Sequence, residues 1–201
     1  REEDGIVISG NTLQFIGGDY DNTSGGADRV AIAFGTDASW TPSSAYVKNA
    51  QVTKNLIHDI IDERTFSAVG IGVAGADGAN VTNNVIANNM LYNIKANGTG
   101  SDQAVGIGLN AGNGDQIVYN SVYSSGDTDP NVNATTTAVS SFGISIASTS
   151  VTNPTIKNNI VYLNLTSSSA GTLKNANINV PSSYAWGTGS SNNNDFYFPA
   201  A

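Results

Sequence analysis

Val69-Gly70-Ile71-Gly72-Val73 and Val105-Gly106-Ile107-Gly108-Leu109 are two copies of one pattern, in which large and small side chains alternate. Two further copies are Val30-Ala31-Ile32-Ala33-Phe34 and Phe142-Gly143-Ile144-Ser145-Ile146. The first residues of successive copies lie 39, 36 and 37 positions apart, which indicates a repeat architecture. Because alternate side chains of an extended strand point to the same face, we expect the large residues of each copy to face one core.

A second motif also recurs, with the order apolar, two variable residues, Asn, one variable residue, apolar. Its copies are Val52 to Ile57, Val81 to Ile86, Ile117 to Val122, and Ile156 to Val161. Two residues five positions apart lie on opposite faces of an unbroken strand, so the chain must bend if both are to enter one core. Asn83 and Asn158 stand at the bend in two copies, and Asn tolerates the left-handed conformation that such a bend requires. The inward asparagines are then expected to stack as a hydrogen-bonded ladder formed by Asn55, Asn84, Asn120 and Asn159.

Together the two motifs predict an all-β fold, a right-handed parallel β-helix (solenoid) of about five to six coils. A β-propeller has a similar repeat length, but its antiparallel blades give no reason for an inward Asn at a fixed bend. The residues beyond three short strands per coil fall mainly after the Asn motif, so loop inserts are expected on one side of the solenoid. The predicted inserts are Asp59 to Ala68, Asn93 to Ala104, Ser124 to Ser141, and Leu165 to Ala176. Residues 1–201 form one predicted domain.

Segments such as Val81 to Asn89 and Ile156 to Tyr162 resemble the repeats of right-handed parallel β-helix proteins, the pectate-lyase-like superfamily. They are similar in particular to the β-helix repeats of large secreted bacterial surface proteins. The resemblance implies an extracellular or bacterial cell-surface location. The superfamily includes lyases, hydrolases, phage tailspikes and adhesins, so the resemblance does not select one function. Because the chain begins at Arg1 without a Met, we expect it to be a fragment or processed piece of a longer protein.

Composition narrows the classes of partner. The chain carries 8 Lys and Arg against 16 Asp and Glu, for a net charge of −8, and this balance disfavours a nucleic acid partner. It contains no Cys, so disulfides and thiolate metal sites are excluded. No segment approaches the length of apolar sequence needed to cross a bilayer, so direct membrane insertion is not expected.

A catalytic set is not visible in the sequence. The family's hydrolases use Asn-Thr-Asp, Asp-Asp and Gly-His-Gly signatures for paired acid and base groups, and none of these occurs here. His58 is the one histidine and is assigned no catalytic role. Acidic residues in neighbouring inserts are candidate oxygen ligands for Ca²⁺, and the alternative is a solvated acidic edge. These residues are Asp59, Asp62, Glu63, Asp102, Asp127 and Asp129.

Aromatic residues outside the repeat motifs are candidate platforms for sugar rings, which stack their apolar faces on aromatic side chains. The candidates are Trp40, Tyr46, Tyr184 and Trp186, and the alternative is that they cover the ends of the core. Tyrosines that recur near the strands are expected to stack on the wall of the solenoid. These are Tyr92, Tyr119, Tyr123 and Tyr162.

Three hypotheses of function follow. The first is a non-catalytic extracellular or cell-surface scaffold or adhesin module, whose insert face binds a polysaccharide or a surface protein. The second is a polysaccharide lyase or glycoside hydrolase of the β-helix type, with Ca²⁺ as its candidate cofactor. The third is self-association of the coils, end to end, into an extracellular filament.

Overall fold

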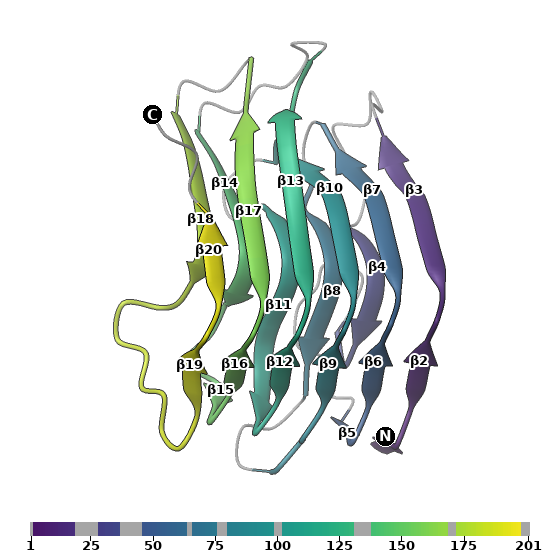
Figure 1. The fold of residues 1–201 in the computed structure, drawn as a ribbon, viewed down its shortest axis with the longest axis vertical. Helices are drawn as coiled ribbons and strands as arrows, with labels where there is room; N and C mark the ends of the chain where they lie inside the picture. The colour runs from purple at the N-terminus through teal and green to yellow at the C-terminus, as the bar shows by residue number, and fades with distance from the viewer. Residues whose placement is uncertain are drawn as a thin grey trace.

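The computed structural model describes residues 2–18, 28–36, 46–63, 66–75, 80–98, 102–130, 138–168 and 172–197. These residues form strands and turns without a helix, and the strands pair in parallel. In Figure 1 the front strands run upward, the back strands run downward, and the coils advance from right to left. This path is a right-handed solenoid, the hand expected for parallel crossover connections. The predicted all-β parallel β-helix is therefore confirmed.

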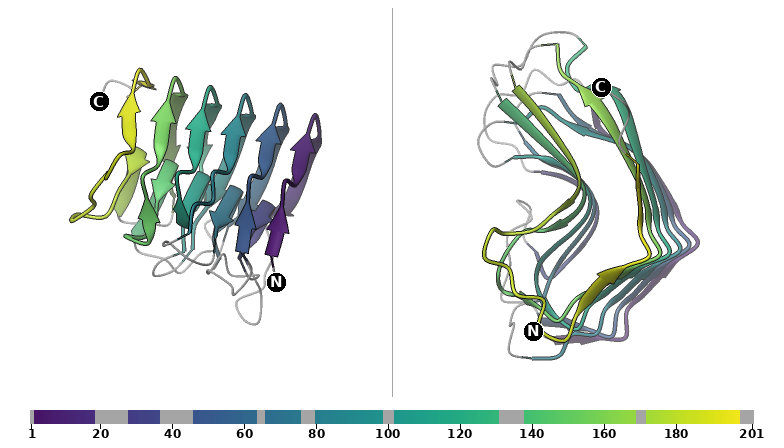
Figure 2. Two further views of the ribbon diagram at one scale, coloured as in Figure 1. Left: turned by 90° about the horizontal axis from the view of Figure 1, so that it is seen from below. Right: turned by 60° about the vertical axis from the view of Figure 1, so that its left-hand side comes forward.

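Three parallel sheets form the wall of the solenoid (Figures 1 and 2). The front sheet contains β3 (Thr12–Gly18), β7 (Leu56–Asp62), β10 (Met90–Ala96), β13 (Ser121–Asp127), β17 (Ile160–Thr166) and β20 (Asp195–Tyr197). The short sheet contains β2 (Val7–Ser9), β6 (Gln51–Thr53), β9 (Val85–Ala87), β12 (Gln116–Val118), β16 (Thr155–Lys157) and β19 (Ser190–Asn192). The back sheet contains β4 (Arg29–Phe34), β8 (Ala68–Ala74), β11 (Ala104–Asn113), β14 (Ala138–Ile146) and β18 (Thr172–Asn179).

Two short pairings complete the described strands. They are β1 (Glu2–Asp4) with β5 (Tyr46–Lys48), and β15 (Val151–Thr152) with the end of β11. The first five coils contribute a strand to each of the three sheets, and the sixth contributes β19 and β20. The long front strands end at one edge of the solenoid, at the top of Figure 1, and the back strands begin at the same edge. Four predicted inserts start inside strands, because β7, β10, β13 and β17 run into their first residues.

The glycine motifs lie directly over one another in the back sheet, with Ile71 paired to Ile107 and Ile107 to Ile144. Their large residues do not all face one core, however, and this prediction was wrong. Ile107 and Leu109 point into the central core, whereas Val69, Val105 and Phe142 form a separate buried cluster with Val30 and Ala176.

Gly106, between Val105 and Ile107, explains why these two side chains do not enter the same cluster. A Cβ on Gly106 would lie 2.6 Å from Cγ1 of Val122 on the front sheet and 2.5 Å from the carbonyl oxygen of Gly143. Gly106 therefore takes the inward position where the two sheets approach most closely, and Val105 faces away from the core. Gly70 and Gly143 stand at the equivalent positions and face Leu91 and Val161.

The bend between the short and front sheets occurs at the same position in all six coils. The residue at the bend has a positive φ in each coil: Gly10 (71°), Lys54 (58°), Asn88 (56°), Tyr119 (58°), Asn158 (57°) and Asn193 (52°). The residue after the bend is an asparagine every time: Asn11, Asn55, Asn89, Asn120, Asn159 and Asn194. One left-handed residue restores the parity of the strand, so that apolar residues on both sides of the bend enter the core.

These six asparagines form a continuous ladder. The side-chain oxygen of Asn120 accepts hydrogen bonds of 3.0 Å from both the backbone N–H and the Nδ2 of Asn89. Asn120 in turn donates from its own N–H (3.0 Å) and Nδ2 (3.1 Å) to Oδ1 of Asn159. The same pattern joins Asn11 to Asn55, Asn55 to Asn89, and Asn159 to Asn194. Each amide thus satisfies buried groups of two coils.

Asn84, which the sequence placed in the ladder, lies outside it. Asn89 takes its predicted place, and Asn84 stands at a second bend, which precedes the short sheet. Asn49, Asn83 and Asn153 have φ values of 54°, 50° and 52° at this second bend. The side-chain oxygen of Asn84 accepts a 2.9 Å bond from the N–H of Ala50, and its own N–H donates to Asp115 Oδ1 at 2.8 Å. Both bends carry an Asn-Asn pair in this coil, Asn83-Asn84 and Asn88-Asn89, and the prediction chose the first pair in place of the second.

Candidate functional site

The outer face of the front sheet carries a row of aromatic side chains, which we call the aromatic row. Strand register places one member in each of five successive coils: His58, Tyr92, Tyr123, Tyr162 and Tyr197. The rings of Tyr123, Tyr162 and Tyr197 stack with centroid separations of 5.0 and 5.1 Å. Their spacing follows the spacing of parallel strands, so the register of the sheet creates the row.

His58 and Tyr92 form the N-terminal part of the aromatic row. Their rings are stacked at 4.5 Å, and the His58 Nδ1 lies 2.7 Å from Oδ2 of Asp59. Stacking of Tyr92, Tyr123 and Tyr162 was predicted from the sequence, and these contacts confirm it. Tyr119 does not join the aromatic row because it occupies the left-handed bend, where its side chain is 59% exposed.

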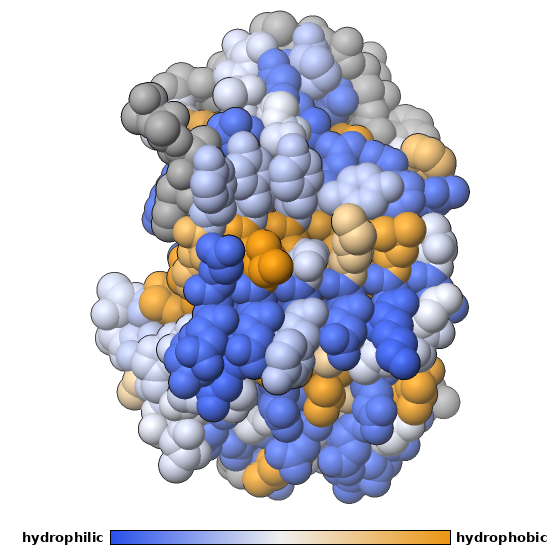
Figure 3. Space-filling view, in the orientation of Figure 1, coloured by the Kyte–Doolittle hydropathy of each residue, from blue (hydrophilic) through white to orange (hydrophobic). Residues whose placement is uncertain are grey.

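An apolar band lies beside the aromatic row, two residues earlier on the same face, where β7, β10 and β17 carry Leu56, Met90 and Ile160. It includes Met90 and Ile160, whose side chains are 53% and 55% exposed, and Tyr123 in the aromatic row is 50% exposed. Figure 3 shows this band as an orange stripe that crosses the molecule between bluer regions. An exposed apolar stripe with a polar rim is typical of a contact surface.

The chemistry of this face combines CH surfaces with hydroxyl groups. Because the tyrosine rings stack on one another, they present edges and phenol oxygens to solvent, and Tyr123 OH lies 3.0 Å from Ser125 Oγ. A partner that carries both apolar CH patches and hydroxyl groups matches such a surface. Sequence reasoning treated these tyrosines as structural and did not single out the face they share.

The described aromatic residues predicted to bind sugars lie in two separate places, Tyr46 in one and Tyr184 with Trp186 in the other. Trp40 lies outside the described residues. Tyr46 is in β5 near the N-terminal end and donates from its hydroxyl to the carbonyl of Val81 at 2.8 Å. Tyr184 and Trp186 lie near the C-terminal end, contact each other edge to face at 5.4 Å, and pack against the core. Burial raises the pKa of Tyr184 to about 12.

The predicted acidic ligands are divided among separate groups. Asp59 accepts from His58 and from Nδ2 of Asn93. Asp127 accepts from the N–H of Ser168 at 3.0 Å and from its hydroxyl, and it also accepts from the N–H of Asp129 at 2.9 Å. Glu63 follows the end of β7 directly. Within the described part of the chain, no group of three or more His, Cys, Asp or Glu side chains is arranged to hold a metal ion.

Asp62 and Asp102 do approach each other, together with Asp28, which sequence reasoning did not select. Ser67 links two members of this acidic cluster: its N–H donates to Asp28 at 2.9 Å and its hydroxyl donates to Asp102 at 3.3 Å. Arg29 Nε lies 3.4 Å from Asp62 Oδ2. The cluster forms because β7 ends where β4, β8 and β11 begin.

Burial and mutual repulsion raise the pKa of two of these carboxyl groups. For Asp28 the main cause is burial, and the charges of Asp102 and Asp62 add to it. For Asp102 burial is again the main cause, with a contribution from Asp62. Asp59 behaves differently: burial alone would raise its pKa, but hydrogen bonds from Asn93 and His58 and the charge of Lys95 lower it.

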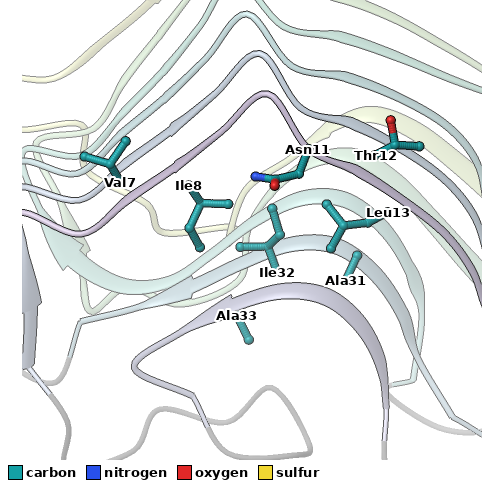
Figure 4. Close-up of a pocket in the computed structure, with 8 residues that line it drawn as sticks. All are labelled: Val7, Ile8, Asn11, Thr12, Leu13, Ala31, Ile32 and Ala33. Carbon is teal, nitrogen blue, oxygen red and sulfur yellow. The ribbon is translucent and has the colours of Figure 1, made fainter.

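A hollow of about 590 Å³ opens at the N-terminal end of the solenoid (Figure 4). Its lining comes from β2, β3, β4 and the bend between the first two: Val7, Ile8, Asn11, Thr12, Leu13, Ala31, Ile32 and Ala33. Three of the lining residues, Ile8, Leu13 and Ile32, pair with residues of the next coil. Their partners, Val52, Ile57 and Ile71, are buried in the core. The hollow is therefore the open end of the core.

No family model matches the chain, and no curated protein or solved structure shows significant similarity to it. The fold rests on the geometry of the chain itself. None of the described segments is a helix long and apolar enough to cross a membrane.

Proposed function

We propose that the chain is a non-catalytic binding module of an extracellular or cell-surface protein, and that the aromatic row and the apolar band bind an extended polysaccharide. The observation that carries the proposal is the continuous outer face of the front sheet, where Tyr123, Tyr162 and Tyr197 form a regular stack beside Met90 and Ile160. The resemblance to pectate-lyase-like repeats and to bacterial surface proteins agrees with this function.

Three physical features support a glycan as the partner. The face is carried by parallel strands braced by the asparagine ladder, so its binding groups are held in place before a ligand arrives. Tyrosines recur on four successive strands, β10, β13, β17 and β20, and the ring separations of 5.0 and 5.1 Å are close to the spacing of successive sugar units in an extended chain. The chain also carries only 8 Lys and Arg against 16 Asp and Glu, and this balance disfavours a nucleic acid as the partner.

Binding to a panel of neutral and acidic polysaccharides tests the proposal. Tyr123→Ala removes the middle of the aromatic row, and Tyr119→Ala is the matched control, since Tyr119 is another tyrosine at least half exposed but lies outside the row. We expect Tyr123→Ala to weaken binding by tenfold or more, and Tyr119→Ala to leave it within twofold of the native chain. Equal losses in both variants, or no binding to any polysaccharide, would contradict the proposal. Binding by the predicted insert face remains a prediction.

The acidic cluster supports a second candidate function, glycoside hydrolysis. This reaction uses one protonated and one ionised carboxyl group, and Asp28 and Asp102 have a raised pKa and share Ser67. Release of reducing ends from polysaccharides, with Asp102→Asn compared with Asp127→Asn, tests this candidate. A hydrolase would lose at least a hundredfold in rate with Asp102→Asn alone, and absence of any release would refute it.

A further inference from the structure

The middle of the aromatic row stands among uncharged side chains. Tyr123 of β13 and Tyr162 of β17 each have an outward neighbour two residues before and two residues after them on the same strand. These four neighbours are Ser121, Ser125, Ile160 and Asn164. A ligand that lies on this part of the face therefore meets hydroxyl, amide and apolar groups.

The strands of the front sheet carry few cations. The six strands contain one Lys or Arg, which is Lys95 in β10, against four Asp. Asp62 is one of these four and is buried, whereas Asp59, Asp127 and Asp195 reach the outer face. The outer positions of these strands therefore present one ammonium group and three carboxyl groups.

Lys95 is already balanced by carboxyl groups of two neighbouring strands. A Cβ on Gly126 of β13 would lie 3.4 Å from Lys95 Nζ, so the ammonium group lies over β13, where Asp127 follows Gly126. Burial alone would raise the pKa of Asp127, but hydrogen bonds, above all from Ser168, and the charge of Lys95 lower it. Lys95 also acts on Asp59 in β7, whose pKa is lowered too. A negatively charged ligand would compete with two carboxylates for this one ammonium group.

We propose that the ligand of the aromatic row is an uncharged, extended glycan that lies along the solenoid axis, with about one sugar unit per coil. This inference rests on the proposed glycan binding and narrows its ligand. The direction follows from the rings of Tyr123, Tyr162 and Tyr197, which succeed one another along the axis at 5.0 and 5.1 Å. A chain that lay along one strand would meet one tyrosine of the row.

A polyuronate has the same extended shape but brings a carboxylate to each coil that it crosses. Beside Tyr162 these carboxylates would meet no cation, and farther along they would approach Asp195, which pairs with Ile160. Lys54 and Lys157 precede the front strands, at the bend and in the short sheet, so they lie outside the row that holds the tyrosines. Like charges repel over a Debye length of about 8 Å at physiological ionic strength. Acidic chains are therefore expected to bind more weakly than neutral chains with the same backbone.

Matched pairs of oligosaccharides test the preference for a neutral chain. Hexamers of β-1,4-glucan and β-1,4-mannan are compared with hexamers of glucuronan and mannuronan, which have a carboxylate in place of each hydroxymethyl group. We expect at least one neutral hexamer to bind, and its acidic counterpart to bind at least tenfold more weakly in about 0.05 M NaCl. Because salt screens the repulsion, the difference is expected to fall to about threefold or less in about 0.5 M NaCl.

A substitution that adds a cation tests whether the row itself sets this preference. Asn164→Lys places a positive charge on an exposed position beside Tyr162 and is expected to reduce the preference for the neutral hexamer at least threefold. The matched control is Asn192→Lys, which adds the same charge to an exposed position of the short sheet. The control is expected to leave the ratio of the two affinities within about 1.5-fold of the native ratio. Circular dichroism spectra that match the native chain show that both variants are folded.

Neutral oligomers of two, three and four units test the orientation of the chain. Tyrosines lie on four successive strands, so each added unit is expected to tighten binding by about threefold or more. An affinity that stops rising after the dimer would contradict a chain that lies along the axis.

The outcomes separate this inference from the proposed function. An acidic hexamer that binds as tightly as its neutral counterpart, or that binds where no neutral chain does, overturns the inference and leaves glycan binding intact. Equal effects of Asn164→Lys and Asn192→Lys would show that the net charge of the chain sets the preference, and would also overturn it. Absence of binding to every polysaccharide refutes the proposed function and this inference together.

Discussion

Replacing Asp115 with Asn is expected to stabilise the protein at neutral pH and to remove most of a pH-dependent loss of stability. Asp115 is completely buried in the second bend, between Asn84 and Pro154. Its Oδ1 accepts from Thr82 Oγ1 at 2.6 Å and from the N–H of Asn84 at 2.8 Å, while its Oδ2 is buried without a hydrogen-bond partner. Pro154, the next residue in this row, has no side chain that could donate to it.

Burial raises the pKa of Asp115 from 3.8 to about 6. Because the folded-state pKa lies above the unfolded value, the native chain holds an extra proton between about pH 4 and pH 6. Stability is therefore greatest below this window, falls as the pH rises through it, and is constant above it. Two pKa units correspond to about 3 kcal/mol, or about 6–12 °C in Tm for a domain of this size.

Asp115→Asn keeps the Oδ1 acceptor and replaces the unpartnered Oδ2 with an amide donor. Asn84 shows what such an amide does one coil earlier, since its Nδ2 donates to the carbonyl of Val47 at 3.3 Å. The equivalent carbonyl for position 115 is that of Val81, which already accepts from Tyr46 OH but has a second lone pair.

Thermal unfolding by circular dichroism at pH 4.5 and pH 7.5 measures the effect. Asp28 and Asp102 also have a raised pKa, so they too lower the stability as the pH rises. The quantity to compare is therefore the change in Tm between the two pH values, in the native chain and in the variant. The control is Asp195→Asn, which changes an exposed carboxylate. A Tm at pH 7.5 that falls in Asp115→Asn, or an unchanged dependence on pH, would refute the reasoning.

Three further substitutions, two of them with a control substitution, test the packing of the coils by chemical denaturation. Asn120→Ala leaves two buried donors of the preceding coil without an acceptor, and it is expected to lower the free energy of unfolding by about 3 kcal/mol or more. Asn11→Ala, in the first coil, is expected to lower it by about 1 kcal/mol or less. Gly106→Ala overpacks the narrow part of the core and is expected to cost about 1–3 kcal/mol, while Gly10→Asn, at a left-handed bend with open space, is tolerated. Tyr119→Asn places at the left-handed bend the residue type that three other coils have there, and it is expected to raise the free energy of unfolding by about 1 kcal/mol.

The sequence was sufficient to predict the fold because each coil repeats the same local requirements. An apolar residue, a left-handed residue and an inward Asn recur at fixed spacing, and the hydrogen bonds of Asn55, Asn120 and Asn159 follow from that spacing. The exchange of Asn84 for Asn89 shows the limit of the pattern. Asn83-Asn84 and Asn88-Asn89 are both an Asn pair followed by apolar residues, and only contact with the neighbouring coils distinguishes them.

The surface that we propose to bind a glycan was harder to predict because it arises between coils rather than within one. Tyr123 and Tyr162 are 39 positions apart, and nothing local to either indicates that their rings are 5.0 Å apart on an open face. Asp28 escaped selection for the same reason: it precedes β4, and only the pairing of β4 with β8 brings it to Ser67. In the aromatic row the contacts that stabilise the sheet also define the surface, because a ring that stacks on its neighbours is held with its edge toward solvent. If the row binds glycan, affinity should therefore depend on Tyr123 and Tyr162 together, with a double substitution losing less than the product of the two single losses.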